Sequence, residues 1–205
     1  SEINVNSKIY RIGSYPINSI NLEKIYEYKK INNFRFLYAG HLNEDKGVGL
    51  LLEVMASLKE YNIQCDFAGR ESDFNSSDIN KIKGCNYLGV FNYFDMVNLI
   101  AKYNFLILPT WHIGEGEPGV IIESMEACTP VIASDFGGIN DLVDQNIGFL
   151  IKPKSFFELR ECILKTFLNK NYYENFYNEL IKRKNKIRSY KDFWEDKLLK
   201  DIYLP

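Results

Sequence analysis

The sequence predicts a three-layer α/β sandwich built around a mainly parallel sheet, and three features of the chain support this fold class. Short apolar runs rich in branched and aromatic residues alternate with helical patterns from about residue 34 onward, as in βαβ units. Glycine-rich segments follow five of these runs. The length of 205 residues, with 46% apolar and 25% charged residues, suits one large soluble domain with a sizeable core.

Six apolar runs are expected to be strands. They span residues 34–39, 63–68, 86–88, 104–109, 131–134 and 149–151. A helix is expected over 47–61, because apolar residues recur there at spacings of three and four and so form one stripe. Helices are also expected over 21–30, 93–103, 118–128 and 155–168. A last helix is expected over 172–204, with a break near residue 189.

Charge, hydropathy and cysteine content exclude several classes of function. The 25 basic side chains nearly cancel the 27 acidic ones, so no nucleic-acid partner is expected. No apolar run is long enough to span a bilayer and no signal peptide is evident, so we expect a soluble, cytoplasmic chain. The four cysteines are widely spaced and only two histidines are present, so no metal site is expected and the cysteines should be small buried residues.

Ten of the 13 glycines lie in the segments that follow five of the expected strands. In open parallel sheets, ligands bind outside the carboxyl ends of the strands, where glycine lets the backbone approach a phosphate or a sugar. A ligand crevice is therefore expected at this edge, although glycines also end strands in any protein. The spacings of an ordinary dinucleotide fingerprint and of a P-loop are both absent.

The segment EGEPGVIIE, residues 115–123, carries the sharpest local signal. Pro118 suits the first position of a helix, where the next amides have no partner and can bind an anion. Glu115 and Glu123 bracket this helix start, and each carboxylate could accept hydrogen bonds from the hydroxyls of a sugar. The alternative is that both carboxylates face water and only favour the helix dipole.

Lys46 lies at the start of the helix expected over 47–61, where a cation opposes the helix dipole. A bound anion would reverse this penalty. The alternative is that Asp45 caps the helix and that Lys46 points into solvent.

Taken together, these segments resemble the donor-binding, C-terminal half of the family 4 glycosyltransferases, also called glycosyl transferases group 1. The matching stretches are FRFLYAGHLNEDKG, IQCDFAG, NYLGV, FLILPTWHIGEGEPGVIIESMEACTPVIAS, DFGGINDLV and GFLIKP. The resemblance implies a Rossmann-like domain, the C-terminal half of a two-domain B-type fold. It covers nearly everything from about residue 9, and the N-terminal acceptor domain of such enzymes is missing.

The resemblance also implies a role for each matched residue. Lys46 would contact the donor diphosphate, Glu115 would hold the transferred sugar, and Glu123 would hold the ribose hydroxyls. Lys46 and Glu115 would thus be the catalytic residues. The other residues implied to bind the donor are Gly40, His41, Val90, Gly116, Glu117, Pro118, Gly119 and Val120. The Gly137-Gly138 pair would lie beside the crevice.

One position departs from the family pattern. The family usually places an arginine directly after the first glycine, whereas this chain has His41, which is only partly charged near neutral pH. The site could work with a weaker clamp, Arg70 could contribute, or catalysis could be impaired. No Asp-x-Asp occurs, in agreement with the metal-independent B-type class, so no metal or cofactor is expected.

The resemblance implies the donor-binding domain of a retaining glycosyltransferase, which transfers a hexose from a nucleoside diphosphate sugar to a glycan or glycolipid acceptor in bacterial surface polysaccharide synthesis. The acceptor would be bound through the missing domain. The alternatives are a non-catalytic module that binds nucleotide sugars or acts as a scaffold, and a B-type sugar-nucleotide epimerase.

In this scheme residues 1–33 form a lead-in and linker with a short helix, and 34–188 form the nucleotide-sugar-binding domain. Residues 189–205 form a terminal helix that would pack on the missing domain. The chain starts at Ser1, which hints at a piece of a longer protein. Five basic residues could attach the parent enzyme to an anionic membrane, or could simply be a solvated helix face. They are Lys182, Arg183, Lys184, Lys186 and Arg188.

Overall fold

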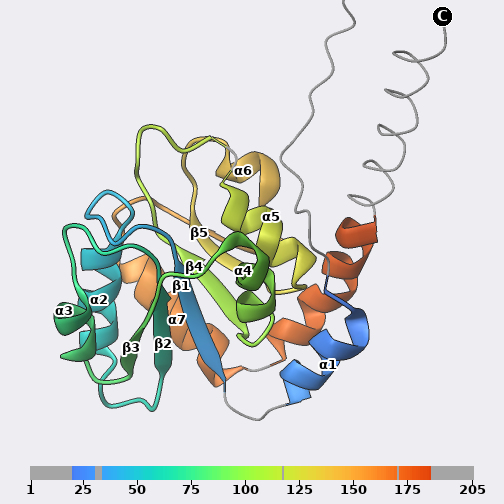
Figure 1. Cartoon of the computed structure of the whole chain (residues 1–205), viewed down its shortest axis with the longest axis horizontal. Helices are drawn as coiled ribbons and strands as arrows, with labels where there is room; N and C mark the ends of the chain where they lie inside the picture. The colour runs from blue at the N-terminus through green and yellow to red at the C-terminus, as the bar shows by residue number, and fades with distance from the viewer. Residues whose placement is uncertain (1–19, 31–33, 117, 170, 186–205) are drawn as a thin grey trace, which may run out of the picture.

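The computed structural model describes residues 20–30, 34–116, 118–169 and 171–185. Its centre is a six-stranded sheet in which every neighbouring pair is parallel. The strands are β1 (Arg35–Ala39), β2 (Gln64–Ala68), β3 (Cys85–Gly89), β4 (Phe105–Leu108), β5 (Val131–Ser134) and β6 (Gly148–Ile151). The sequence-based prediction of six strands in a Rossmann-like α/β sandwich is confirmed (Figure 1).

The strand order β3-β2-β1-β4-β5-β6 places the first and fourth strands side by side at the middle of the sheet. The chain runs outward from β1 in one direction and, after returning to β4, outward in the other direction. Such a reversal leaves a crevice between the loops that follow the two central strands. The loops after β1 and β4 are therefore the first place to look for a ligand site.

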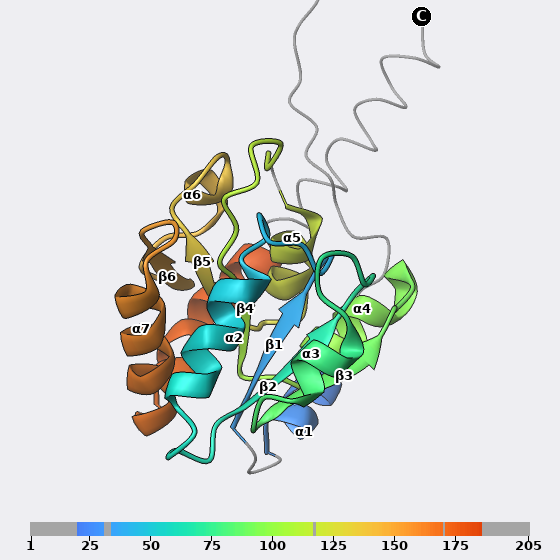
Figure 2. The same cartoon turned by 90° about the vertical axis from the view of Figure 1, so that its left-hand side faces the viewer.

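Helices cover both faces of the sheet (Figures 1 and 2). The named helices are α1 (Leu22–Lys30), α2 (Val48–Ser57), α3 (Ser76–Asn80), α4 (Tyr93–Ile100), α5 (Gly119–Glu126), α6 (Ile139–Leu142) and α7 (Phe156–Leu168). A further helix spans 172–185 within the described residues. On one face α2 packs against α7, and on the other α4 packs against α5. Among the described helices, none is long and apolar enough to cross a membrane.

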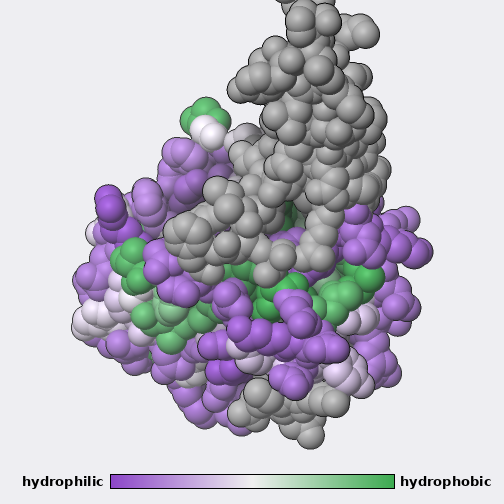
Figure 3. All heavy atoms as spheres, turned by 45° about the vertical axis from the view of Figure 1, so that its right-hand side comes forward, coloured by the Kyte–Doolittle hydropathy of each residue, from purple (hydrophilic) through white to green (hydrophobic). Residues whose placement is uncertain are grey.

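The core is a continuous cluster in which aromatic rings join the sheet to the last helices. Phe36 and Phe105, which are fully buried on β1 and β4, lie 6.1 Å apart between ring centroids. Phe176 of the 172–185 helix meets Phe105 edge-on at 6.2 Å and Phe149 of β6 at 5.3 Å. The surface is largely hydrophilic, with hydrophobic residues gathered in a band across the middle of the face shown in Figure 3. All four cysteines are buried, as predicted.

Helix α3 was not predicted from the sequence. Its start is a capping box, in which the Asn75 side chain accepts hydrogen bonds from the amides of Ser77 and Asp78, and the Asp78 side chain accepts one from the Asn75 amide. With five residues, this helix is too short to show an apolar period. The short α6 was missed for the same reason, and the break expected near residue 189 lies outside the described residues.

The predicted surface cluster of basic residues is wrong for Lys184. This side chain is 1% exposed, and its Nζ donates to the carbonyls of Ile20 and Glu126, each at 2.7 Å, and lies 3.2 Å from the Glu126 carboxylate. Arg183 is paired with Asp144 and lies 3.7 Å from Glu179. Lys184 thus stabilises the packing of the last helix on α5, because a buried ammonium needs such partners. Lys186 and Arg188 lie outside the described residues.

Candidate functional site

The loops after β1 and β4 run side by side at the carboxyl edge of the sheet. The backbone amide of Trp111 donates to the carbonyl of Asp45 at 2.8 Å. Gly47 has a φ of 79°, and a Cβ at this position would lie only 2.1 Å from the carbonyl oxygen of Pro109. A glycine is therefore required here, because any side chain would push the two loops apart.

This approach brings Lys46 and Glu115 together from positions 69 residues apart. The Lys46 Nζ donates to Glu115 Oε2 at 2.6 Å, and the two side chains are 20% and 11% exposed. The same oxygen accepts a hydrogen bond of 2.9 Å from the hydroxyl of Thr110, a fully buried residue. No hydrogen bond from the other described residues reaches Glu115 Oε1. One carboxylate oxygen is thus fixed by the protein while the other stays available.

The alternative in which Asp45 caps the helix and Lys46 points into solvent is wrong. Helix α2 starts at Val48, Gly47 occupies its N-cap position, and no side chain caps it. The Asp45 carboxylate instead lies 2.5 Å from Nδ1 of His112, across the two loops. The amide of His112 also donates to the Thr110 hydroxyl at 3.1 Å.

The contact between Asp45 and His112 and the buried hydroxyl of Thr110 were missed in the sequence. Each residue taken alone carries no motif, and only the neighbouring positions of β1 and β4 in the sheet bring them together. Both contacts hold the two loops in the register that joins Lys46 to Glu115.

Helix α5 starts one residue later than predicted. Pro118 is the N-cap rather than the first helical residue, with φ −63° and ψ 118°, and no side-chain cap is present. The amides of Gly119 and Val120 lie in the first turn, where a helix offers no internal acceptor. They therefore form a candidate anion site at the positive end of the helix dipole. Gly116 is exposed, and Glu117 lies outside the described residues.

Glu123 lies one turn inside α5 and is 8% exposed. Burial raises the pKa of its carboxyl to about 7. Among the described residues, no hydrogen bond or ion pair reaches this carboxyl. The alternative of two solvated carboxylates is therefore wrong, because Glu115 is paired and Glu123 is buried.

The other residues expected at the site lie along the same edge of the sheet. The loop after β1 is anchored to the loop after β2, since the amide of Gly40 donates to the Ala68 carbonyl and that of Leu42 donates to the Arg70 carbonyl. The carbonyl of His41 accepts a hydrogen bond of 2.6 Å from the buried Tyr38 hydroxyl, while the residue itself is exposed. Arg70 is thus next to the His41 loop through the backbone, and its side chain is exposed as well.

Val90 follows β3, two strands away from β1, and is 69% exposed. It therefore follows a strand that is not a neighbour of β1 or β4, whose loops carry Lys46 and Glu115. Gly137 does lie beside them, because its φ is 58° and a Cβ there would be 2.2 Å from the carbonyl oxygen of Glu115. The loop after β5 therefore closes the crevice on the side of β5. In the described part of the chain, no three His, Cys, Asp or Glu side chains are grouped as metal ligands.

Residues 23–183 match the model of the family described as glycosyl transferases group 1. The chain belongs to this family. The match covers more than half of the chain and includes both central loops and the whole of α5, so the site lies within the family's own domain.

Two relatives and one solved structure show how far the similarity extends. TuaC of Bacillus subtilis (strain 168), named for a provisional role as a glycosyltransferase in teichuronic acid biosynthesis, is 30% identical over 129 residues, which are 63% of this chain and 32% of TuaC. CapM of Staphylococcus aureus, a capsular polysaccharide biosynthesis glycosyltransferase, is 24% identical over 189 residues, which are 89% of this chain and 49% of CapM. The chain thus spans half or less of these relatives.

The fold is also that of HepE from Anabaena, whose crystal structure contains UDP and glucose. The TM-score is 0.60 at 18% identity, over 84% of this chain and 53% of HepE. At this identity the similarity concerns the fold, and the roles of the residues depend on their geometry in this chain.

Proposed function

We propose that the chain is the donor-binding half of a retaining, B-type glycosyltransferase of family 4. It would bind a nucleoside diphosphate sugar and supply its hexose to a glycan or glycolipid acceptor in bacterial surface polysaccharide synthesis. The observation that carries the proposal is the convergence of Lys46 and Glu115 at the crevice between β1 and β4, beside the uncapped start of α5. The presence of UDP and glucose in HepE and the names of TuaC and CapM support the proposed donor and pathway.

The residues divide the donor by charge. The diphosphate would lie between the ammonium of Lys46 and the amides of Gly119 and Val120, which together meet the negative charge that develops when the sugar leaves. A transition state of this kind is stabilised by donors that are fixed before the reaction. The Lys46 ammonium and these two amides would balance the negative charge of the leaving diphosphate, so the proposal includes no metal or cofactor.

The two carboxylates would hold the two sugars. Glu115 Oε1, which receives no hydrogen bond from the described residues, would accept hydrogen bonds from the hydroxyls of the transferred sugar. Glu123 would accept them from the ribose, which would give its buried carboxyl the polar partners that it lacks among the described residues. Thr110 is then a positioning residue, because it fixes the oxygen of Glu115 that faces Lys46.

The acceptor is the part of the reaction that this chain leaves to another domain. Transfer requires that the acceptor hydroxyl be held close to the reacting carbon of the sugar. Without the domain that binds the acceptor, most of the rate enhancement that comes from orienting the two substrates would be lost. The chain alone should therefore bind the donor and transfer its sugar slowly.

Isothermal titration calorimetry of the chain with UDP, GDP and ADP and with their glucose or mannose conjugates tests the proposal. We expect heat of binding for one base, and Glu123→Ala should weaken that binding by about 10- to 100-fold, since a hydrogen bond to a charged group contributes about 1.5–3 kcal/mol. Absence of binding to all of them by a folded sample would refute the donor site.

A non-catalytic binding module remains the second candidate, because His41 stands where the family pattern has arginine. It predicts the same donor binding. Transfer or donor hydrolysis after an N-terminal acceptor domain is added would exclude it.

A further inference from the structure

The two loops that hold Lys46 and Glu115 also border a second hollow of about 400 Å³. Its walls come from the loop after β1, the first turns of α2, the loop after β4 and the loop after β6. The lining residues are Glu44, Gly49, Leu50, Glu53, Trp111 and Lys154. The hollow therefore lies on the side of the sheet where α2 and α7 pack together, which Figure 2 turns toward the viewer.

Neighbouring residues of each loop contribute to different parts of this edge of the sheet. Lys46 and Thr110 both contact Glu115. Asp45, next to Lys46, contacts His112 across the two loops. Glu44 and Trp111 line the second hollow. The backbone bond from Trp111 to Asp45 fixes this arrangement. The walls of the hollow are thus held in place before any ligand arrives.

The lining combines an aromatic plane with carboxylates. The indole of Trp111 is partly exposed, and the ammonium of Lys154 lies 5.1 Å from its ring centroid. Glu44 and Glu53 are exposed, and neither carboxylate has an ion-pair partner among the described residues. A pyranose ring presents a C–H face that packs on such an indole and hydroxyls that donate to such carboxylates. The volume lies within the range of about 300–1,000 Å³ typical of small-molecule sites.

We propose that this hollow is a carbohydrate-binding subsite, separate from the donor crevice, which binds a neutral or amino sugar by stacking it on Trp111. Two carboxylates against one ammonium disfavour a uronic acid or a phosphorylated sugar. The sugar would displace the Lys154 ammonium at small cost, since cation–π contacts at exposed sites are weak. The assignment of this sugar to the glycan acceptor or product rests on the proposed function.

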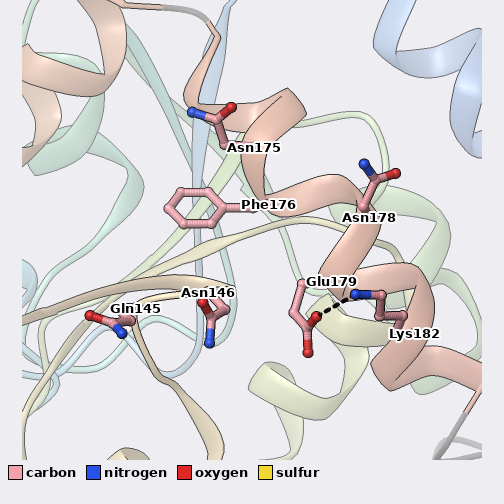
Figure 4. A pocket seen from close by; sticks show the side chains of 7 residues that line it. All are labelled: Gln145, Asn146, Asn175, Phe176, Asn178, Glu179 and Lys182. Atoms are coloured by element: carbon pink, nitrogen blue, oxygen red, sulfur yellow. Dashed lines mark hydrogen bonds and ion pairs between the residues drawn. The ribbon is translucent and has the colours of Figure 1, made fainter.

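A different hollow of similar size, on another part of the chain, offers a control. It holds about 360 Å³ between the loop before β6 and the 172–185 helix, and its lining includes Gln145, Asn146, Asn175 and Phe176 (Figure 4). Phe176 is only 5% exposed, so it offers no face on which a sugar could stack. The carboxylate of Glu179 at its rim is already 3.4 Å from the Lys182 ammonium.

The fluorescence of Trp111 reads the proposed subsite directly. The only other tryptophan of the sequence, Trp194, lies outside the described residues, so Trp194→Phe leaves Trp111 as the sole indole. In this background, methyl glucoside and methyl glucosaminide at millimolar concentrations should change the emission saturably, and methyl glucuronide should do so much less. Saturation-transfer NMR on the sugars should show binding weakened roughly tenfold by Trp111→Ala, partly restored in Trp111→Phe and unchanged by Asn175→Ala.

Lack of saturable binding by the neutral sugars, or binding that Trp111→Ala leaves unchanged, would overturn the subsite. Calorimetry with UDP, GDP and ADP on the same sample separates this failure from that of the donor site. Nucleotide binding without sugar binding refutes the subsite alone. Sugar binding at Trp111 without nucleotide binding supports the subsite and refutes the donor site.

Discussion

Replacement of Glu123 by glutamine should stabilise the folded chain at alkaline pH and have little effect at acidic pH. The pKa of this carboxyl is about 7 in the folded chain, because burial disfavours the charged form, against an ordinary value of 4.5. Below about pH 4.5 both states are protonated, and above about pH 7 both are ionised. Between these values only the unfolded chain has lost the proton, so stability falls as the pH rises.

The size of the effect follows from the two pKa values. The increase from 4.5 to about 7 corresponds to about 3 kcal/mol, at about 1.4 kcal/mol per pKa unit. Urea denaturation of the wild type and of Glu123→Gln, at intervals between about pH 4.5 and about pH 8, measures this quantity directly. The advantage of the variant should grow by up to about 3 kcal/mol over this range and then level off.

Glu53→Gln provides the control. Glu53 is an exposed residue of α2, so this variant shows the effect on stability of removing one carboxylate charge without any change in burial. A difference between Glu123→Gln and the wild type that stays constant with pH would show that the Glu123 carboxyl is solvated. The argument that it needs the hydroxyls of a ligand would then fail.

Three further changes test other parts of the structure. Lys46→Ala should weaken binding of the nucleoside diphosphate in calorimetry by about 10- to 100-fold, since a charge-assisted contact is lost, and an unchanged affinity would remove Lys46 from the site. His41→Arg should tighten the same binding severalfold, because an arginine adds a fixed positive charge that can pair with a diphosphate, and an unchanged affinity would show that residue 41 does not contact the ligand. Lys184→Met should lower the free energy of unfolding by about 3 kcal/mol, because the buried Glu126 carboxylate loses its contact with the Lys184 ammonium, whereas the exposed Lys182→Met should change it by less than about 1 kcal/mol. Equal effects of the two lysine changes would contradict the burial of Lys184.

The strands were predictable because each is a short run of buried apolar residues bounded by polar or glycine segments. Val131–Ser134 was predicted to the residue, and the other strands differ by one residue at one or both ends. Helix α3 was not predictable in this way, because its start depends on hydrogen bonds of Asn75 and Asp78 rather than on an apolar stripe.

The candidate site was predictable as a set of residues but not as a geometry. The glycines and the 115–123 motif indicate a crevice, whereas the contact of Lys46 with Glu115 depends on the strand order that makes β1 and β4 neighbours. Lys184 could not be placed, because a basic run looks the same in sequence whether it faces water or a buried carboxylate. Its role follows from the packing of the 172–185 helix on α5.

The central claim is that Lys46 and Glu115 divide one donor between its diphosphate and its sugar. Glu115→Gln tests it most directly, in calorimetry with UDP and UDP-glucose or with the pair of matching base. Loss of the carboxylate releases Lys46 from the contact of 2.6 Å, so the bare diphosphate should bind as tightly as before or more tightly, while the sugar nucleotide loses its hydroxyl acceptor and binds more weakly. The ratio of the two affinities should therefore fall by about tenfold or more. An unchanged ratio would contradict the assignment of Glu115 to the sugar and, with it, the proposed division of the site.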